Sequence, residues 1–277
     1  MFKINIIVGV SLALLVTTGC SSAAAETSSS TVSTSKPEVV LEASGSATTT
    51  SILAGIASAF EADTPGYRIK TLTGTGTGGG VEGMMSGALD VAAMGRAPTD
   101  EEAPHVEFVS LGWGGEAPIA HADIPITELT TEQLTAVFSG EISNWSELGG
   151  PDLPIIVYVR GDSTDHTKAV RKAVFGDTPF LETAQMMGSL GDMLTAVAGT
   201  PGSIGYANWP AVVATEAKVN AITVDGVGPN DPTYPGVLQL GIGYLPERQA
   251  EVQPLVDWLQ SERGQARLAE SGVIITQ

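Results

Sequence analysis

Cysteine is almost absent from this sequence, since Cys20 is the only one among 277 residues. No disulfide can form within one chain, so the folded part must be held together by its hydrophobic core alone. Basic residues are also scarce, because 13 lysines and arginines stand against 31 aspartates and glutamates, a formal net charge of -18. This charge argues against nucleic acid and anionic membrane surfaces as partners. Any anionic ligand must therefore be captured by local donors.

Sequence patterns typical of catalysis and of metal binding are missing as well. The three histidines, His105, His121 and His166, lack the spacing of a metal site, and no Gly-x-Ser-x-Gly elbow supplies a nucleophile. Residues 74–80 formally match Gly-x-Gly-x-x-Gly, but a predicted strand begins only about ten residues later, which argues against a dinucleotide site. We therefore expect no catalytic residue, no metal and no cofactor.

The apolar run at the N-terminus is too short to cross a bilayer. It covers residues 4–16, within the ~7–15 residues of a signal-peptide core and short of the ~20 of a membrane-spanning helix. Gly19-Cys20 follows it and resembles the lipobox of bacterial lipoproteins, in which the cysteine is lipidated; an ordinary cleavable signal with an incidental cysteine is the alternative. We expect a lipoprotein signal peptide over 1–20, a flexible Ser/Thr/Ala tether over 21–36, and an exported protein anchored at the cell envelope.

Loops of small and hydroxylic residues are the most informative local pattern. Residues 74–80 read Gly-Thr-Gly-Thr-Gly-Gly-Gly between a predicted strand and a predicted helix, and Ser/Thr loops recur at 45–50 and 160–167. Glycine lets consecutive amide N–H groups approach a ligand, threonine adds hydroxyl donors, and the positive end of a helix dipole favours anions. The three loops together predict one shared pocket for an oxyanion.

The order of predicted elements indicates an α/β fold. Strands and helices alternate from residue 39 to residue 94, an order typical of a parallel sheet with ligands beyond the carboxyl ends of its strands. A capping box at 130–133 predicts another helix. The expected strands are 39–43, 67–72, 90–94, 155–159 and 202–206, a strand-like and glycine-rich segment covers 106–119, and the expected helices are 52–60, 81–89, 130–138, 167–175 and 246–269.

These motifs, in this order, resemble the phosphate-binding component of bacterial phosphate ABC importers, which are type 2 periplasmic binding proteins. The resemblance rests on 45–48, 74–81, 129–145, 160–162, 201–206 and 261–265. It implies a two-lobed α/β fold with mixed sheets and a hinge, with lobe I over 37–115 and 211–277 and lobe II over 116–210. It also implies a monomeric, non-enzymatic receptor that captures inorganic phosphate and delivers it to an ABC permease, touching the membrane through its lipid anchor only.

The same resemblance assigns ligand-binding residues, among which Arg160 supplies the formal positive charge. Its planar guanidinium can donate paired hydrogen bonds to two oxygens. Two departures leave selectivity open: Gly95 and Arg96 stand where the family has an acidic or hydroxyl side chain, and Asp165-His166 replace Gly-Thr. Sulfate, molybdate or a phosphonate as ligand, an exported phosphatase-like enzyme, and a sensor or scavenger without a transporter remain alternatives. The expected ligand-binding residues are Ser46, Thr48, Thr49, Thr77, Gly78, Arg96, Arg160, Thr164, Asp165 and His166, with Cys20 as the lipidation site.

Overall fold

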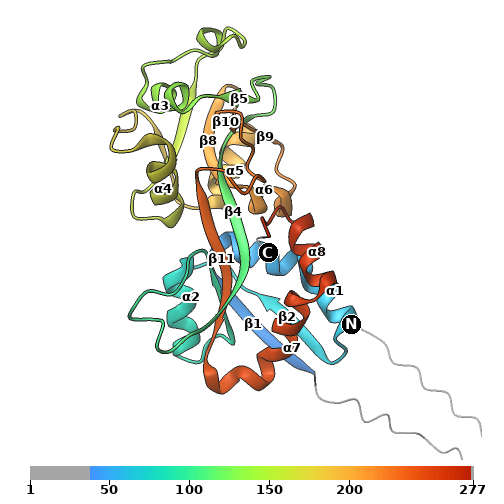
Figure 1. The fold of residues 1–277 in the computed structure, drawn as a ribbon. Helices are drawn as coiled ribbons and strands as arrows, with labels where there is room; N and C mark the ends of the chain where they lie inside the picture. The colour runs from blue at the N-terminus through green and yellow to red at the C-terminus, as the bar shows by residue number, and fades with distance from the viewer. Residues whose placement is uncertain (1–37, 276–277) are drawn as a thin grey trace, which may run out of the picture. The chain divides into compact units, whose positions relative to one another are not determined.

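The computed structural model describes residues 38–275 of the chain (Figure 1). The predicted signal peptide, Cys20 and the tether over 21–36 lie outside these residues. None of the helices between residues 38 and 275 combines the length and the apolar character that crossing a membrane requires.

One mixed sheet of nine strands organises the described residues. Its strands are β1 (Val39–Gly45), β2 (Tyr67–Thr71), β3 (Val91–Met94), β4 (Glu107–His121), β6 (Ile156–Arg160), β7 (Gln185–Met187), β8 (Ser203–Asn208), β9 (Val219–Ala221) and β11 (Val237–Tyr244). Their order is β2-β1-β3-β11-β4-β8-β6-β7, with β9 paired to β4. The pairs β1–β2, β1–β3, β6–β8 and β6–β7 are parallel, whereas β11 and β4 run antiparallel to their neighbours. The expected α/β fold with a mixed sheet is thereby confirmed. A separate parallel pair joins β5 (Glu128–Leu129) to β10 (Thr223–Val224).

Eight α-helices connect these strands within the described residues. They are α1 (Ala47–Asp63), α2 (Gly76–Met85), α3 (Thr131–Ser139), α4 (Asp165–Val170), α5 (Leu190–Gly199), α6 (Trp209–Thr215), α7 (Gln249–Gln260) and α8 (Glu262–Glu270). The predicted capping box of α3 is present, because Thr130 Oγ1 accepts from the Gln133 N–H at 3.1 Å while Gln133 Oε1 accepts from the Thr130 N–H at 2.9 Å.

Three helix predictions were wrong in their limits. The helix expected over 81–89 begins at Gly76 and ends at Met85, since its first turn is built of glycine and threonine and shows no apolar periodicity. The single helical region expected over 246–269 is divided at Ser261, whose Oγ accepts from the Gly264 N–H at 3.1 Å and so caps α8. The helix expected over 167–175 begins earlier, at Asp165, and changes to a π-helical turn over Arg171–Phe175.

Strand β4 links two hydrophobic cores. Its first part pairs with β11 and its last part, from Glu116, pairs with β8, and it runs beside β11 through the middle of the ribbon (Figure 1). One core gathers residues of β1, α1, β3, β11 and α7; the other gathers residues of α3, β6 and β8 together with Ile222, Val224 and Tyr234. These last three fall in the predicted lobe I but pack with the second core. The lobe boundaries themselves stay a prediction.

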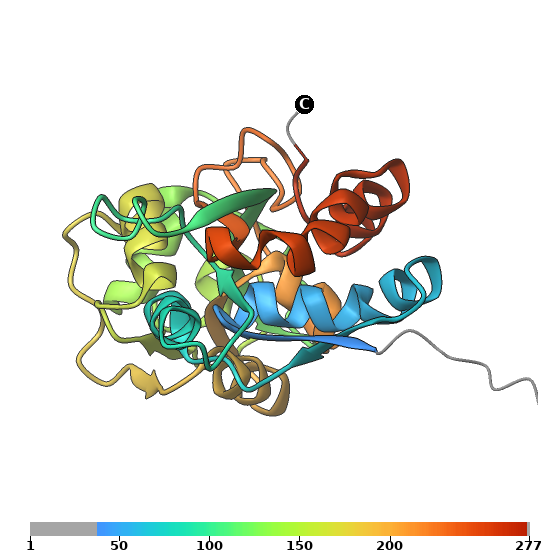
Figure 2. The same cartoon turned by 90° about the horizontal axis from the view of Figure 1, so that it is seen from below.

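The C-terminal helices close the first core against α1. In both views α8 lies beside α1 (Figures 1 and 2). Trp258 of α7 meets Phe60 of α1 edge to face at 5.8 Å between ring centroids, and its indole N–H donates to Asp63 at 2.9 Å. This packing fixes α1, the helix that follows β1. It therefore also fixes the N-terminus of α1 at the carboxyl end of the sheet.

Candidate functional site

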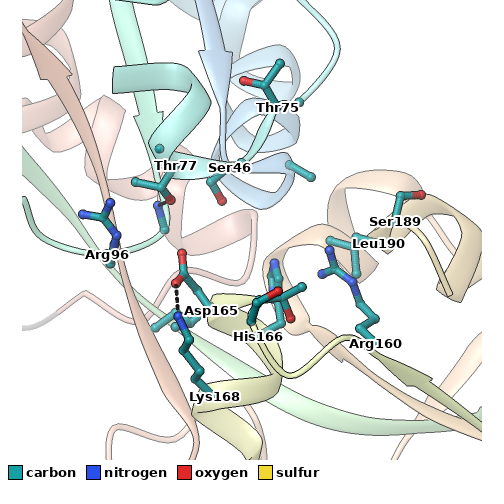
Figure 3. Close-up of a pocket in the computed structure, with 18 of the residues that line it drawn as sticks. Ser46, Thr75, Thr77, Arg96, Arg160, Asp165, His166, Lys168, Ser189 and Leu190 are labelled. Carbon is teal, nitrogen blue, oxygen red and sulfur yellow. Dashed lines mark hydrogen bonds and ion pairs between the residues drawn. The ribbon is translucent and has the colours of Figure 1, made fainter. Parts of the chain in front are cut away.

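A cavity of about 700 Å³ lies at the carboxyl ends of five strands. The segments after β1, β2, β3, β6 and β7 all contribute to its wall, as expected for a ligand site in an α/β sheet. Figure 3 shows side chains of these segments turned toward one another. The lining residues are Ser46, Ala47, Gly74, Thr75, Gly76, Thr77, Gly78, Gly95, Arg96, Thr99, Arg160, Ser163, Thr164, Asp165, His166, Lys168, Gly188, Ser189, Leu190 and Leu238.

The N-termini of α1 and α2 both reach this wall. In neither helix does the N-cap side chain, that of Ser46 or of Thr75, bond to an amide of the first turn. The first N–H groups of a helix have no partner within the helix, and here no cap side chain occupies them. Two helix dipoles therefore present positive ends and free donors to the cavity, which suits an anion.

Close backbone approach brings α2 against the end of β1. A Cβ on Gly80 of α2 would lie 2.7 Å from both Gly45 Cα and Ser44 O of β1, so only glycine allows this contact. Gly45 itself has φ +143°, and a Cβ there would lie 2.1 Å from the carbonyl oxygen of Ala93. Gly80 therefore sets the distance between α2 and the end of β1, and Gly45 allows β1 to approach β3 closely.

Arg160 ends β6, and two of its guanidinium nitrogens find no partner in the described part of the chain. Its backbone N–H donates to the Tyr206 hydroxyl at 2.8 Å, while its Nε and Nη1 are buried and have no hydrogen-bond partner among residues 38–275. Burial lowers the pKa of Arg160, and the negative charge of Glu116 opposes this effect. Because guanidinium stays protonated in proteins, two buried charged donors are left without an acceptor, and their desolvation cost falls when an anion binds.

Arg96 lines the cavity but is already paired. Its Nη1 and Nη2 donate to the two carboxylate oxygens of Glu102 at 2.6 and 2.9 Å. The hydrogen bond from Arg96 lowers the pKa of Glu102 to about 2 and raises the pKa of Arg96. The preceding residue, Gly95, donates its N–H to Thr77 Oγ1 at 3.0 Å, which joins the β3 end to the glycine loop.

The start of α4 contributes side chains of both signs. Thr164 caps the helix by accepting from the Thr167 N–H at 3.2 Å, and Asp165 lies 4.0 Å from Lys168 (Figure 3). His166 Nδ1 lies 2.7 Å from Oε1 of Glu116, a residue of β4 that is 1% exposed. The imidazole is thus fixed from behind the cavity wall.

Eight of the ten residues predicted to bind the ligand line this one cavity. Thr48 and Thr49 do not line it: Thr49 Oγ1 donates to the Met94 carbonyl at 2.8 Å inside the protein, and Thr48 Oγ1 is buried without a partner among the described residues. The lipidation prediction for Cys20 lies outside the described residues. The eight that line it are Ser46, Thr77, Gly78, Arg96, Arg160, Thr164, Asp165 and His166.

Among the residues at or behind the cavity wall that were not predicted are three with polar contacts at the site. Lys168 lies one helical turn after Asp165, and this i,i+3 spacing of opposite charges can be read from the sequence. Ser189 caps α5 by accepting from the Asp192 N–H at 3.0 Å, and the Ser-x-x-Asp pattern could have indicated it. No local sequence pattern indicates Glu116, because its contact with His166 joins residues 50 positions apart.

Comparisons with known proteins place this geometry in a family. The model of the PBP superfamily domain matches residues 22–263. The phosphate-binding protein PstS of Bacillus subtilis is 31% identical over 196 residues, an alignment that spans 68% of this chain and only 63% of that protein. PstS of Borreliella burgdorferi is 23% identical over 219 residues, covering 74% of this chain and 78% of that protein. Both relatives are named binding proteins and not enzymes, in agreement with the expectation that this chain is not an enzyme.

Solved structures share the fold. A chain from Clostridium perfringens, described as a phosphate ABC transporter substrate-binding protein and solved with bound phosphate, superposes with a TM-score of 0.73 at 26% identity over 86% of this chain and 100% of that chain. An ABC-type phosphate transport receptor from Vibrio cholerae has a TM-score of 0.61 at 24% identity, over 85% of this chain and 100% of that chain. The chain therefore belongs to the PBP superfamily, with the type 2 fold and a distant homology to the PstS phosphate-binding proteins.

Proposed function

We propose that the protein is an extracytoplasmic solute-binding protein that captures inorganic phosphate between two lobes and delivers it to an ABC permease. The observation that carries the proposal is the unpaired guanidinium of Arg160 beside the uncapped N-termini of α1 and α2 in one cavity. The phosphate-binding relatives and the phosphate-bound Clostridium structure support it.

The donors at this site suffice for useful affinity. A micromolar Kd corresponds to about 8 kcal/mol, and each hydrogen bond to a charged group contributes about 1.5–3 kcal/mol. Two bonds from Arg160 and a few from the first amides of α1 and α2 reach that sum, with some left to offset the cost of ordering the ligand. Local donors thus overcome the net charge of -18, whose field is screened over about 8 Å.

Closure of two lobes, 37–115 with 211–277 and 116–210, would complete the donor shell. Binding pockets for drug-sized ligands measure about 300–1,000 Å³, so the 700 Å³ cavity exceeds what one oxyanion fills. The change of partner along β4 near Glu116 supports a hinge at this point. A lipid on Cys20 and the tether over 21–36 would hold the protein at the membrane; mass spectrometry of the mature N-terminus tests that anchor.

A different tetrahedral oxyanion is the second candidate ligand. Gly95 has no side chain, so this position supplies no acidic group that could recognise a protonated anion. Titration calorimetry of the purified protein with phosphate, sulfate, arsenate, molybdate and a phosphonate separates the candidates. Tightest binding of phosphate supports the proposal, and tighter binding of sulfate or molybdate refutes it. Hydrolysis of a chromogenic phosphate ester, abolished by Arg160→Ala, would favour the phosphatase alternative instead.

A further inference from the structure

We propose that His166, held by Glu116, supplies a hydrogen-bond acceptor by which the pocket selects tetrahedral oxyanions that carry a proton, such as hydrogen phosphate or hydrogen arsenate, over sulfate. This inference rests on the proposed function and names the selectivity device of the same site. Figure 3 shows the imidazole between Asp165 and Arg160 in that view.

Glu116 is fixed from several directions. Its Oε1 accepts from Asn208 Nδ2 at 2.7 Å as well as facing His166 Nδ1 at 2.7 Å. Its backbone N–H donates to the Gly236 carbonyl at 2.7 Å, and its carbonyl accepts from the Tyr234 hydroxyl at 3.2 Å. The carboxylate therefore has a defined position, and His166 must adapt to it.

This contact determines which nitrogen of His166 carries the proton. An ionised carboxylate only accepts hydrogen bonds, so Nδ1 must donate to Glu116. In a neutral imidazole the other nitrogen, Nε2, then presents its lone pair. Since Nδ1 is committed to Glu116 and the residue lines the cavity, Nε2 is the ring nitrogen available to a ligand.

The charge opposite Glu116 is already supplied by Arg160. Burial lowers the pKa of Arg160, and the negative charge of Glu116 opposes this effect. A second cation on His166 is not required to neutralise Glu116. When the imidazole is neutral, its acceptor is therefore Nε2, because Nδ1 faces Glu116.

The rest of the wall offers mostly donors. Amide groups of α1 and α2 and the guanidinium of Arg160 only donate, while Gly95 has no side chain to supply an acceptor. Among the described lining side chains the acceptors with no proton to give are Asp165, which lies 4.0 Å from the Lys168 ammonium, and His166 Nε2. A ligand that carries a proton would donate it in a hydrogen bond to Nε2. A fully deprotonated ligand oxygen would instead place its own lone pair against that of Nε2, with no hydrogen between the two atoms.

Two matched variants test the acceptor. His166→Asn keeps a polar group near the Nδ1 position and removes the Nε2 position, whereas His166→Gln places an amide oxygen near Nε2. With calorimetry on phosphate and sulfate, we expect His166→Asn to lower the phosphate-to-sulfate affinity ratio at least tenfold, mainly by weakening phosphate, and His166→Gln to retain more of it. An unchanged ratio in His166→Asn, an equal loss for both anions, or loss of the ratio in Asp165→Asn alone overturns the inference.

The tautomer provides a readout that does not depend on binding. Long-range proton–nitrogen NMR spectra distinguish an imidazole protonated at Nδ1 from one protonated at Nε2, and the His166→Asn spectrum assigns the signal among three histidines. We expect the Nδ1–H form in the wild type and its loss in Glu116→Gln, which still folds if the thermal melt stays cooperative. An Nε2–H or fully protonated ring in the wild type overturns the inference. If the wild type binds neither anion, the proposed function itself is refuted. A changed or unchanged phosphate-to-sulfate affinity ratio tests only the role of His166.

Discussion

Two arginines line the same cavity, but only one of them is free to bind a ligand. Arg96 donates two hydrogen bonds to Glu102, whereas Arg160 has two buried donors without partners among the described residues. We expect Arg160→Ala to weaken phosphate binding at least tenfold and Arg96→Ala to weaken it less, as measured by titration calorimetry. Arg160→Lys keeps the charge but loses the planar guanidinium. Its effect on phosphate affinity should lie between those of Arg160→Ala and Arg96→Ala. A stronger effect of Arg96→Ala than of Arg160→Ala would contradict this assignment.

The Arg96–Glu102 pair should make the protein sensitive to acid. The pKa of Glu102 is lowered from 4.5 to about 2 in the folded state, so its stabilising contribution is present above pH ~4.5 and is lost as the pH falls toward ~2. Urea unfolding of the wild type and of Glu102→Gln at pH 6 and pH 3 measures this. The variant should lose less stability between the two pH values; an equal loss in both proteins would show that the pair contributes nothing.

At the level of single residues, the sequence predicts what lies next to a recognisable loop. Ser46, Thr77 and Arg160 follow strands and reach the cavity as expected. The side chains of Thr48 and Thr49 follow the same loop, yet the helical turn of α1 points them into the interior. Glu116 could not be predicted, because only the tertiary fold brings it to His166.

At the level of elements, the spacing between β1 and α2 positions the N-terminus of α2, which is proposed to bind the anion. Adding a methyl group at Gly80 forces it against the backbone of Gly45 and Ser44, so Gly80→Ala should cost about 1–3 kcal/mol of the free energy of unfolding and weaken phosphate binding. Gly55→Ala is the matched control, since Gly55 is exposed in α1 with nothing within 4 Å of a Cβ. It should raise the free energy of unfolding by about 0.5–1 kcal/mol. Urea unfolding of both variants measures these free energies of unfolding. Equal effects would mean that α2 can shift away from β1 with no loss of stability.

Elements with strong apolar periodicity or a cap were predicted well, and glycine-rich ones were not. The β1–α1–β2 order and the capping box of α3 follow directly from the residues. The first turn of α2 has no apolar side chain, so its start was displaced by about five residues. Strand β11 was not predicted at all, and its place between β3 and β4 depends on antiparallel pairing with segments more than 100 residues away.

At the level of the whole molecule, a ligand held between two cores must stabilise both. Phosphate at a hundred times its Kd should raise the free energy of unfolding by about 2.7 kcal/mol, if it binds the folded state alone. Thermal melts with phosphate, compared with sodium chloride at equal ionic strength, measure this shift. An equal shift with chloride would indicate general screening of the net charge of -18 and not a specific site.

We expect Arg160 and the first amides of α1 and α2 to hold one tetrahedral anion between them. A crystal structure of the protein grown with phosphate tests it most directly. We expect one phosphate within hydrogen-bond distance of Arg160 Nε and Nη1 and of the amides that begin both helices. A phosphate bound elsewhere, with Arg160 Nε and Nη1 still without an acceptor, would contradict this assignment of the site.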